Sequence, residues 1–222
     1  MHLFSGLLYT SRAFSLTHSI KVKGIVVILI CLFTTSCAIK NGSINTYINP
    51  SYRKGEIAKL AFLSFSNQDF SNIEAKMIDK MVLEATRKKN PEIKILTHSE
   101  TMKLIVENAL EDELEEFLNK YNTEGIVDKH LLLKFSKHLG IDGIIRGRLI
   151  NKEQNEGDGF FLRGESRIRI SYSILKCKTG KSIWEVTANG VRVNALDTLE
   201  PPPMIEAVNL AINKVTDSIP HL

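Results

Sequence analysis

The sequence has few cysteines and few prolines. Only three of its 222 residues are cysteines, and two of them, Cys31 and Cys37, lie near the amino terminus. Cys177 then has no partner for an internal disulfide, and we expect it to be a small buried strand residue. Six prolines and 13 glycines are too few for a collagen-like or low-complexity chain. The hydrophobic content of 43% is sufficient for a packed core.

The chain also lacks a concentrated charge of one sign. The formal net charge is +4, but Arg12, Lys21 and Lys23 precede residue 37 and no acidic residue does. Without those three, the 29 basic residues become 26, against 25 acidic ones. Because phosphate binding requires clustered cationic side chains, this balance excludes nucleic acid as the expected partner.

Signatures of catalysis are missing as well. The sequence contains no Gly-x-Ser-x-Gly elbow, no His-Glu-x-x-His and no paired cysteine motif. Residues 179–182 (TGKS) end like a phosphate-binding loop, but Leu175 stands where its first glycine is required, and a strand pattern follows. We therefore predict a hairpin turn there, and no catalytic residue, metal or dissociable cofactor. A hydrolase whose residues converge only in the fold stays open as a third hypothesis.

The amino terminus carries an export signal. Residues 24–33 are uninterrupted apolar residues, preceded by Lys21 and Lys23. A run of about ten residues matches the core of a signal peptide, whereas a helix needs roughly 20 to span a bilayer.

The residues after this core resemble the bacterial lipobox, in which small residues precede an acylated cysteine. Here Thr34, Thr35 and Ser36 precede Cys37. The resemblance implies that Cys37 carries covalent lipid such as palmitate, becomes the first mature residue and binds the lipid membrane. Ala38, in place of aspartate, implies the outer membrane, facing the periplasm. The alternative is an ordinary signal peptide with an incidental cysteine, or a short membrane anchor.

Three parts follow from this organisation: a signal peptide (1–36), Cys37 with a flexible polar tether (37–55), and a folded domain (56–219). The tether would reach at most roughly 60 Å. Within the domain, the patterns predict the order β-α-β-α-α-β-β-β-α. We expect a single two-layer α/β domain, with a mixed sheet of about five strands and helices packed on one face. The first three strands can be parallel, and the last three form an antiparallel meander.

Short motifs in this order resemble a known group of envelope domains. They are Phe65-Ser66-Asn67 after the first strand, Leu139-Gly140-Ile141-Asp142 before a strand containing Gly147, and Thr179, Gly180 and Trp184 in the last hairpin. The pattern is similar to the domain shared by CsgG lipoproteins of curli secretion, LpoB-type activators of penicillin-binding proteins, DUF799-like lipoproteins and the amino-terminal domain of TolB. The resemblance implies the fold over roughly residues 55–218.

The chain departs from two of these relatives where their functions reside. Residues 152–164 are too short and polar for the pair of barrel strands that a CsgG-type pore adds, since each needs roughly 9–11 residues. Residues 38–55 are too short to cross the periplasm in the manner of an LpoB-type activator. These departures therefore give no support for a pore or an activator function here.

Four arginines alternate with apolar residues in two predicted strands: Arg146, Arg148, Arg167 and Arg169. If the strands are neighbours, these side chains share the open sheet face and form a candidate docking surface for an acidic or glycan partner. The alternative is a solvated face with Glu165 and Glu185 as partners. A second charged feature is residues 111–116, with five acids in six residues, which we expect to be a solvated helix face.

Together these patterns predict a non-catalytic lipoprotein anchored in the cell envelope, which binds envelope proteins and is open to homo-oligomerisation. The alternative is an oligomeric accessory component of an envelope secretion or transport apparatus.

Overall fold

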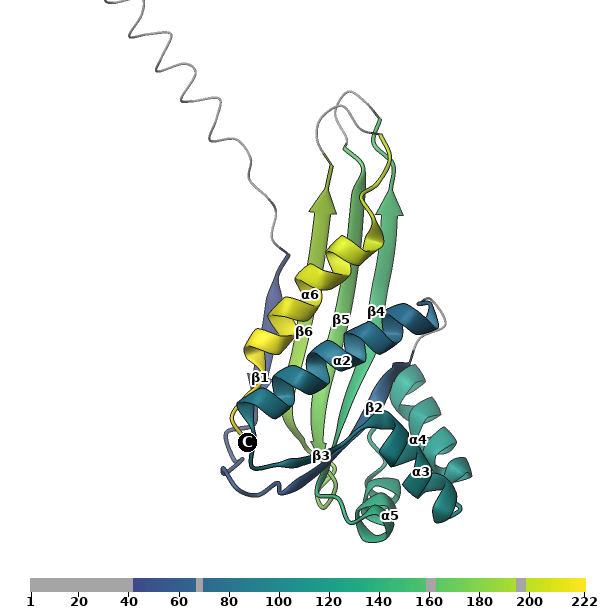
Figure 1. Cartoon of the computed structure of the whole chain (residues 1–222), viewed down its shortest axis with the longest axis vertical. Coiled ribbons are helices and arrows are strands. Elements are labelled where there is room, and N and C mark those ends of the chain that lie inside the picture. The colour runs from purple at the N-terminus through teal and green to yellow at the C-terminus, as the bar shows by residue number, and fades with distance from the viewer. Residues whose placement is uncertain (1–41, 67–69, 159–162, 195–198) are drawn as a thin grey trace, which may run out of the picture. The chain divides into compact units, whose positions relative to one another are not determined.

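The computed structural model describes residues 42–66, 70–158, 163–194 and 199–222. The predicted signal peptide, Thr34, Thr35, Ser36 and Cys37 lie outside these residues. Eleven elements are assigned in the described part (Figure 1). The strands are β1 (Ile44–Ile48), β2 (Lys59–Ser66), β3 (Lys94–Leu96), β4 (Gly143–Asn155), β5 (Glu165–Lys176) and β6 (Ser182–Val193). The helices are α2 (Asn72–Lys89), α3 (His98–Glu107), α4 (Glu111–Glu124), α5 (Lys129–Leu139) and α6 (Met204–Ser218).

The strands form one mixed sheet in the order β1-β6-β5-β4-β2-β3. β2 is parallel to both β3 and β4, and β4, β5, β6 and β1 pair antiparallel. The predicted single α/β domain with a mixed sheet is confirmed, as are its parallel first half and its antiparallel meander. No helix within the described residues is both long and apolar enough to cross a membrane.

The helices cover both faces of the sheet, whereas one face was predicted. α2 and α6 pack on one face, where Phe62, Tyr172 and Trp184 are buried in one hydrophobic cluster. α3, α4 and α5 contribute to a second cluster with Leu63 and Ile144 from the other face. The reason is topological: β3 and β4 flank β2 on opposite sides, so two right-handed crossovers place their helices on opposite faces.

β1 corrects a second expectation, because it lies inside the predicted flexible tether. Its residues pair antiparallel with β6 from Ile44 opposite Ala188 to Ile48 opposite Trp184. All five residues of β1 are exposed, so no burial pattern marks the strand in the sequence. At the other end, Leu222 is buried, and the folded part extends beyond the predicted boundary at residue 219.

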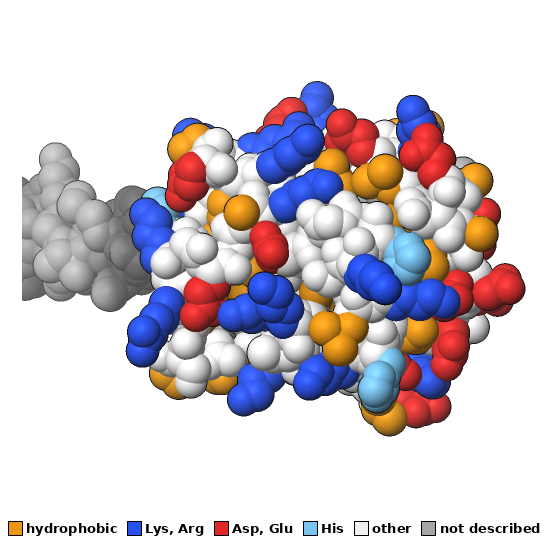
Figure 2. Space-filling model, turned by 90° about the horizontal axis from the view of Figure 1, so that it is seen from below, with side chains coloured by type: hydrophobic (Ala, Val, Ile, Leu, Met, Phe, Trp, Pro, Cys, Tyr) orange, Lys and Arg blue, Asp and Glu red, His pale blue; other side chains and the backbone are white. Residues whose placement is uncertain are grey.

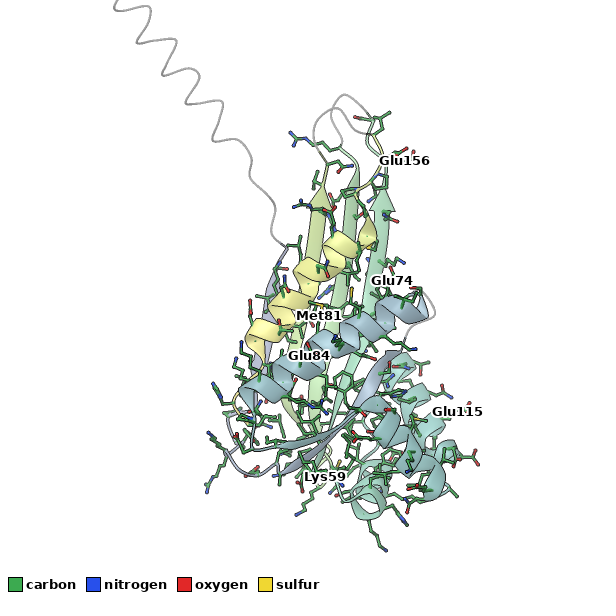
Figure 3. All side chains as sticks on the ribbon, in the orientation of Figure 1. Lys59, Glu74, Met81, Glu84, Glu115 and Glu156 are labelled. Atoms are coloured by element: carbon green, nitrogen blue, oxygen red, sulfur yellow. The ribbon has the colours of Figure 1, made fainter. Side chains whose placement is uncertain are left out.

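The helix ends follow local signals that the sequence displays. Capping boxes open α2 at Ser71 with Glu74, which Figure 3 places at the beginning of that helix, and α3 at Thr97 with Glu100. Gly140 ends α5 in the left-handed conformation, at φ 61°. These caps satisfy backbone groups that a helix end leaves unpaired.

The Leu-Gly-x-Asp motif has a structural role. A carboxylate oxygen of Asp142 accepts hydrogen bonds from the backbone N–H groups of Ala58 (2.9 Å) and Lys59 (3.0 Å). The ammonium of Lys59 donates to the carbonyl of Leu139 at the end of α5 (2.8 Å). These bonds hold the start of β2 against the turn that leads into β4.

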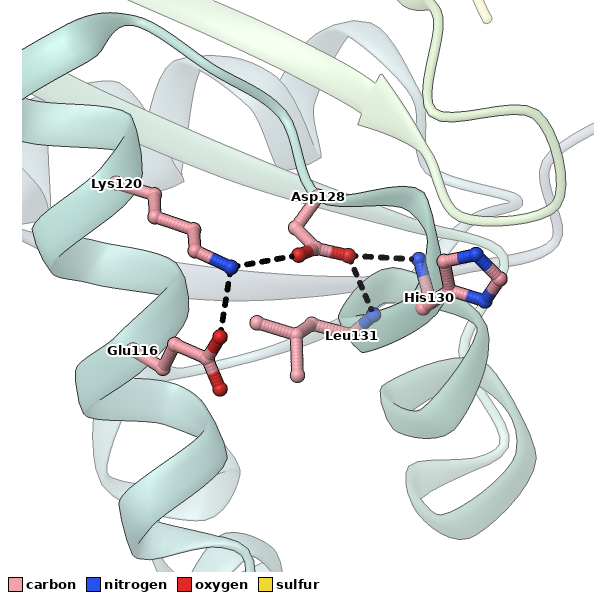
Figure 4. Close-up of polar contacts among 5 residues, drawn as sticks. All are labelled: Glu116, Lys120, Asp128, His130 and Leu131. Atoms are coloured by element: carbon pink, nitrogen blue, oxygen red, sulfur yellow. Dashed lines mark hydrogen bonds and ion pairs between the residues drawn. The ribbon is translucent and has the colours of Figure 1, made fainter.

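α4 and α5 are joined through Asp128, the residue that caps α5 (Figure 4). One oxygen of Asp128 accepts from the backbone N–H of His130 (2.9 Å) and Leu131 (3.3 Å). Its other oxygen accepts from the Lys120 ammonium (3.0 Å), which also donates to Glu116 (2.6 Å). The pKa of Asp128 is lowered, first by this bond from Lys120. The contact fixes the second half of α4 to the amino end of α5.

Gly190 provides a test of how α6 docks. A Cβ at this position would lie 1.8 Å from the carbonyl oxygen of Ala207 in α6. We expect Gly190→Ala to lower the free energy of unfolding by at least about 2 kcal/mol, because helix backbone must move away from the sheet. Thr187→Ala, on the opposite face of β6, should change it by about 0.5 kcal/mol or less. Urea unfolding measures the free energy of unfolding of both variants. Equal losses in Gly190→Ala and Thr187→Ala would contradict the close contact of α6 with β6 at Gly190.

Candidate functional site

The sheet face that carries α3–α5 is only partly covered. The helices lie over β2 and the beginning of β4, and the far halves of β4, β5 and β6 extend beyond them (Figure 1). On this far part, Arg167 and Arg169 are exposed, and Asn189 and Val191 are half-buried. We call this region the open face, defined by Asn151, Glu153, Arg167, Arg169, Asn189 and Val191.

The register places all four predicted arginines on the same side of the sheet. On β4, Arg146 lies opposite Ser173 and Arg148 lies opposite Ser171. After a register shift between Leu149 and Asn151, Arg169 pairs with Asn151 and Arg167 with Glu153. The series therefore runs from beneath α4 out to the open face, as the alternation in the sequence predicts. That this series is a partner surface stays a prediction.

The inner end of the series is unlike the solvated face that the sequence also allowed. Arg146 is 1% exposed. Its Nη2 donates to the side-chain oxygen of Asn122 in α4 (2.8 Å), and its guanidinium carbon lies 5.6 Å from the centre of the Tyr121 ring. The pKa of Arg146 is lowered to about 10, chiefly because the guanidinium is buried; Tyr121 opposes this shift, and the neighbouring charge of Arg148 adds to it.

Arg148 contacts the same aromatic ring. Its guanidinium carbon lies 5.9 Å from the centre of the Tyr121 ring, and the side chain is half-buried. The Tyr121 hydroxyl is hydrogen-bonded to the Ser173 hydroxyl (2.7 Å), which holds the ring against the sheet. Two guanidinium groups therefore converge on one tyrosine that α4 brings to the sheet.

The outer arginines differ in their partners. Arg167 pairs with Glu165, and its Nε donates to a carboxylate oxygen at 2.8 Å. Glu165 is one of the two acids that the sequence offered as partners for the arginines. Arg169 forms no hydrogen bond or ion pair with the described residues. Beside it is an open hollow of about 320 Å³, whose wall includes Gly42, Ser43 and Asn189. The open face thus reaches the point where the described chain begins.

The acidic segment lies on α4, next to the arginine series. Its exposed acids are Glu111, Asp112, Glu115 and Glu116. Figure 2 shows acidic side chains grouped most closely on the side of the molecule where α4 lies, with basic and further acidic side chains interspersed over the remainder. A surface with both signs close together suits a protein partner better than a uniformly charged one.

The structure also tests the hydrolase hypothesis, because it brings together a serine, an aspartate and a histidine. The Ser64 hydroxyl donates to Asp79, which also accepts from the backbone N–H of Phe65 (2.8 Å). Nδ1 of His98 accepts from the backbone N–H of Ser64 (3.2 Å). Nucleophilic catalysis requires the histidine to accept from the serine hydroxyl, and here that hydroxyl is bonded to the carboxylate. The cluster instead supports the irregular end of β2.

No protein-family model and no curated protein matches the chain. The solved structures that it resembles include the PelC dodecamer from Paraburkholderia phytofirmans (12% identity, TM-score 0.44), with 80% of this chain and 96% of that chain covered. Another is lipoprotein GNA1162 from Neisseria meningitidis (10% identity, TM-score 0.44), with 72% of this chain and 99% of that chain covered. A third is the LpoB C-terminal domain from Salmonella enterica (10% identity, TM-score 0.38), with 65% of this chain and 87% of that chain covered. These scores are too low to carry a conclusion about function.

Asp79 gives a prediction with a defined sign. Burial raises its pKa, and the bonds from Ser64 and Phe65 offset part of that rise. The folded state therefore holds the proton to higher pH than the unfolded state, and the contribution of Asp79 to stability is lost as pH rises through the raised pKa. Asp79→Asn, which stays neutral, should gain stability relative to the natural protein as pH increases from 4 to 7.

Asp79→Ala serves as the comparison. It leaves the N–H of Phe65 without a partner, and we expect it to lower the free energy of unfolding by about 1–3 kcal/mol. Urea unfolding across this pH range measures both variants. A difference between Asp79→Asn and the natural protein that falls with pH would contradict the assigned direction.

Proposed function

We propose that the protein is a lipoprotein of the cell envelope, anchored through acylated Cys37 in the outer membrane, that binds envelope proteins without catalysing a reaction. The likeness of its motifs to the CsgG, LpoB and TolB amino-terminal domains belongs to this proposal. The observation that carries it is the position of the open face. Gly42 and Ser43 line the same hollow as Arg167 and Arg169.

The distance from the lipid to this face is short. Gly42 follows Cys37 by five residues, which span at most about 18 Å when fully extended. The carbonyl of Gly42 accepts from the Lys214 ammonium, and that of Ser43 accepts from the N–H of Asn189 (2.8 Å). The chain is thus fixed to the domain almost immediately after the predicted anchor, which keeps the open face close to the membrane surface.

The anchor is tested by replacing its sulfur. Cys37→Ala should abolish labelling with radioactive palmitate and move the protein out of the membrane fraction, because two or three acyl chains supply the binding energy. Cys177→Ala is the matched control, since Cys177 is buried in the domain, and it should keep both label and location. Unchanged labelling of Cys37→Ala would refute the lipid anchor.

The binding surface is tested by site-specific photocrosslinking in the native cells. A benzoylphenylalanine at Asn151 lies on the open face, and one at Glu84 lies on the exposed side of α2 (Figure 3). We expect discrete cross-linked products from position 151 that Arg169→Glu reduces at least tenfold, and few from position 84. Equal products from both positions, or products insensitive to Arg169→Glu, would contradict the assignment of this face.

One observation favours the alternative of an oligomeric envelope component. β1 is an edge strand, and Ile44, Tyr47 and Ile48 are 45%, 49% and 52% exposed. The backbones of Ser43 and Asn49 bond to β6, so in an antiparallel ladder the N–H and C=O groups of Ile44, Thr46 and Ile48 point away from the sheet. Such an edge, without a charge or proline, can accept another strand. Native mass spectrometry in detergent distinguishes a discrete assembly from a monomer.

A further inference from the structure

Arg146 is a buried cation, and the part of the chain that the structure describes places no neutralising anion beside it. It is 1% exposed, and its Nε is buried with no hydrogen-bond partner. Among the described residues, its side chain donates one hydrogen bond, to the neutral amide of Asn122. No acidic side chain within the described residues forms an ion pair with it. A buried charge is unfavourable unless it is paired and hydrogen-bonded. Arg146 therefore destabilises the folded state as long as no anion is bound next to it.

Arg148 adds a second unpaired cation next to the first. Its Nε is also buried without a partner, and it forms no ion pair with the described residues. Both guanidinium groups lie within 6 Å of the same ring centre, at 5.6 and 5.9 Å, and their charges repel. Arg148 differs from Arg146 in being half-buried, so it can be reached from the open face.

Two features of the site offset part of this positive charge. The face of the Tyr121 ring attracts cations, and both guanidinium groups are close enough to benefit. Asn122 lies in the last turn of α4, whose carboxyl end carries a partial negative charge. Neither supplies a formal anion with oxygen atoms that could accept from the two free Nε–H groups.

We propose that Arg148 binds a carboxylate from an extended acidic segment of a partner protein that lies along the open face. The buried charge of Arg146 beside it adds to the attraction. This inference rests on the proposed function and names the chemistry of its partner. Arg169 supplies the next position, because it is diagonal to Arg148 across β4 and β5. Diagonal neighbours lie about 7–8 Å apart, and alternate side chains of an extended segment are separated by about 6.6 Å. Acidic residues at alternate positions therefore fit.

A phosphate-rich membrane surface fits this site less well. The arginine series lies next to the acidic helix α4, with exposed Glu115 and Glu116, and an anionic bilayer laid over the site would also approach these carboxylates. Glu153 on the open face and Glu165, which is bonded to Arg167, add further negative charge. An extended peptide is narrow enough to meet the arginines and avoid the acids. The fork of a guanidinium also pairs bidentately with a carboxylate.

The test uses the full-length lipidated protein in detergent micelles. The probe is a blocked heptapeptide with glutamate at alternate positions, and the matched control peptide has glutamine at those positions. Arginine Nε–H signals in ¹⁵N NMR report on Arg146 and Arg148 directly, and fluorescence anisotropy gives the affinity. We expect saturable binding of the glutamate peptide, shifts of both Nε–H signals, and at least tenfold weaker binding of the glutamine peptide.

Variants identify the residue responsible. Arg148→Gln should weaken binding at least tenfold, and Arg148→Lys should give an intermediate value, because lysine keeps the charge and loses the fork. Arg192→Gln is the matched control, since Arg192 pairs with Glu206 of α6 on the other face, and it should bind as the natural protein does. Similar affinities for Arg148→Gln and Arg192→Gln would overturn the proposal.

A further arm separates the sources of the anion. Vesicles of phosphatidylglycerol replace the peptide, and shifts of the Nε–H signals by vesicles but not by the peptide would overturn the peptide assignment. Absence of a response to either probe would overturn the site itself. Failure of the proposed function is detected separately. Unchanged palmitate labelling in Cys37→Ala would refute the anchor, whereas peptide binding by that variant should equal that of the natural protein and depends on the arginines alone.

Discussion

The position of β2 between β3 and β4 is the constraint on which the rest of the structure depends. β2 is parallel to both neighbours, so the chain must cross the sheet twice, once in each direction. Right-handed crossovers then place α2 on one face and α3–α5 on the other. Because β4 has 13 residues and β2 only eight, the second group of helices covers the beginning of β4 and leaves its far half uncovered. The open face is a consequence of this difference in length.

The same constraint produces the unusual environment of Arg146. Arg146 lies opposite Ser173 on the covered part of β4, whereas Arg148 and Arg169 lie progressively further out. α4 brings Tyr121 and Asn122 over the first of these. Arginine suits such a place better than lysine, because its delocalised charge is less strongly hydrated and stacks on an aromatic ring. One periodic pattern in the sequence thus yields a buried, a half-buried and an exposed cation.

Much of this fold is predictable because its signals are local. A capping box, a left-handed glycine or an alternating strand acts within a few residues, so the signals at Ser71, Thr97 and Gly140 are visible in the sequence. The alternation also placed the four arginines on one face, once β4 and β5 were taken as neighbours. The burial of Arg146 was not predictable, since it depends on the docking of α4, which is separated from β4 in the sequence by another helix.

β1 shows the other limit of prediction, and it lies between the predicted anchor in the sequence and the candidate site. A strand exposed on both faces has no hydrophobic alternation, and its pairing with β6 depends on backbone bonds that any sequence can form. Its inclusion in the sheet shortens the predicted tether from 18 residues to the few that precede Gly42. An anchor on a long tether would let the domain turn freely, whereas a short one limits the orientations that the open face can take toward the membrane. Under the proposed function, the partners within reach of that face would be those next to the lipid, so the predicted anchor and the arginines would act together.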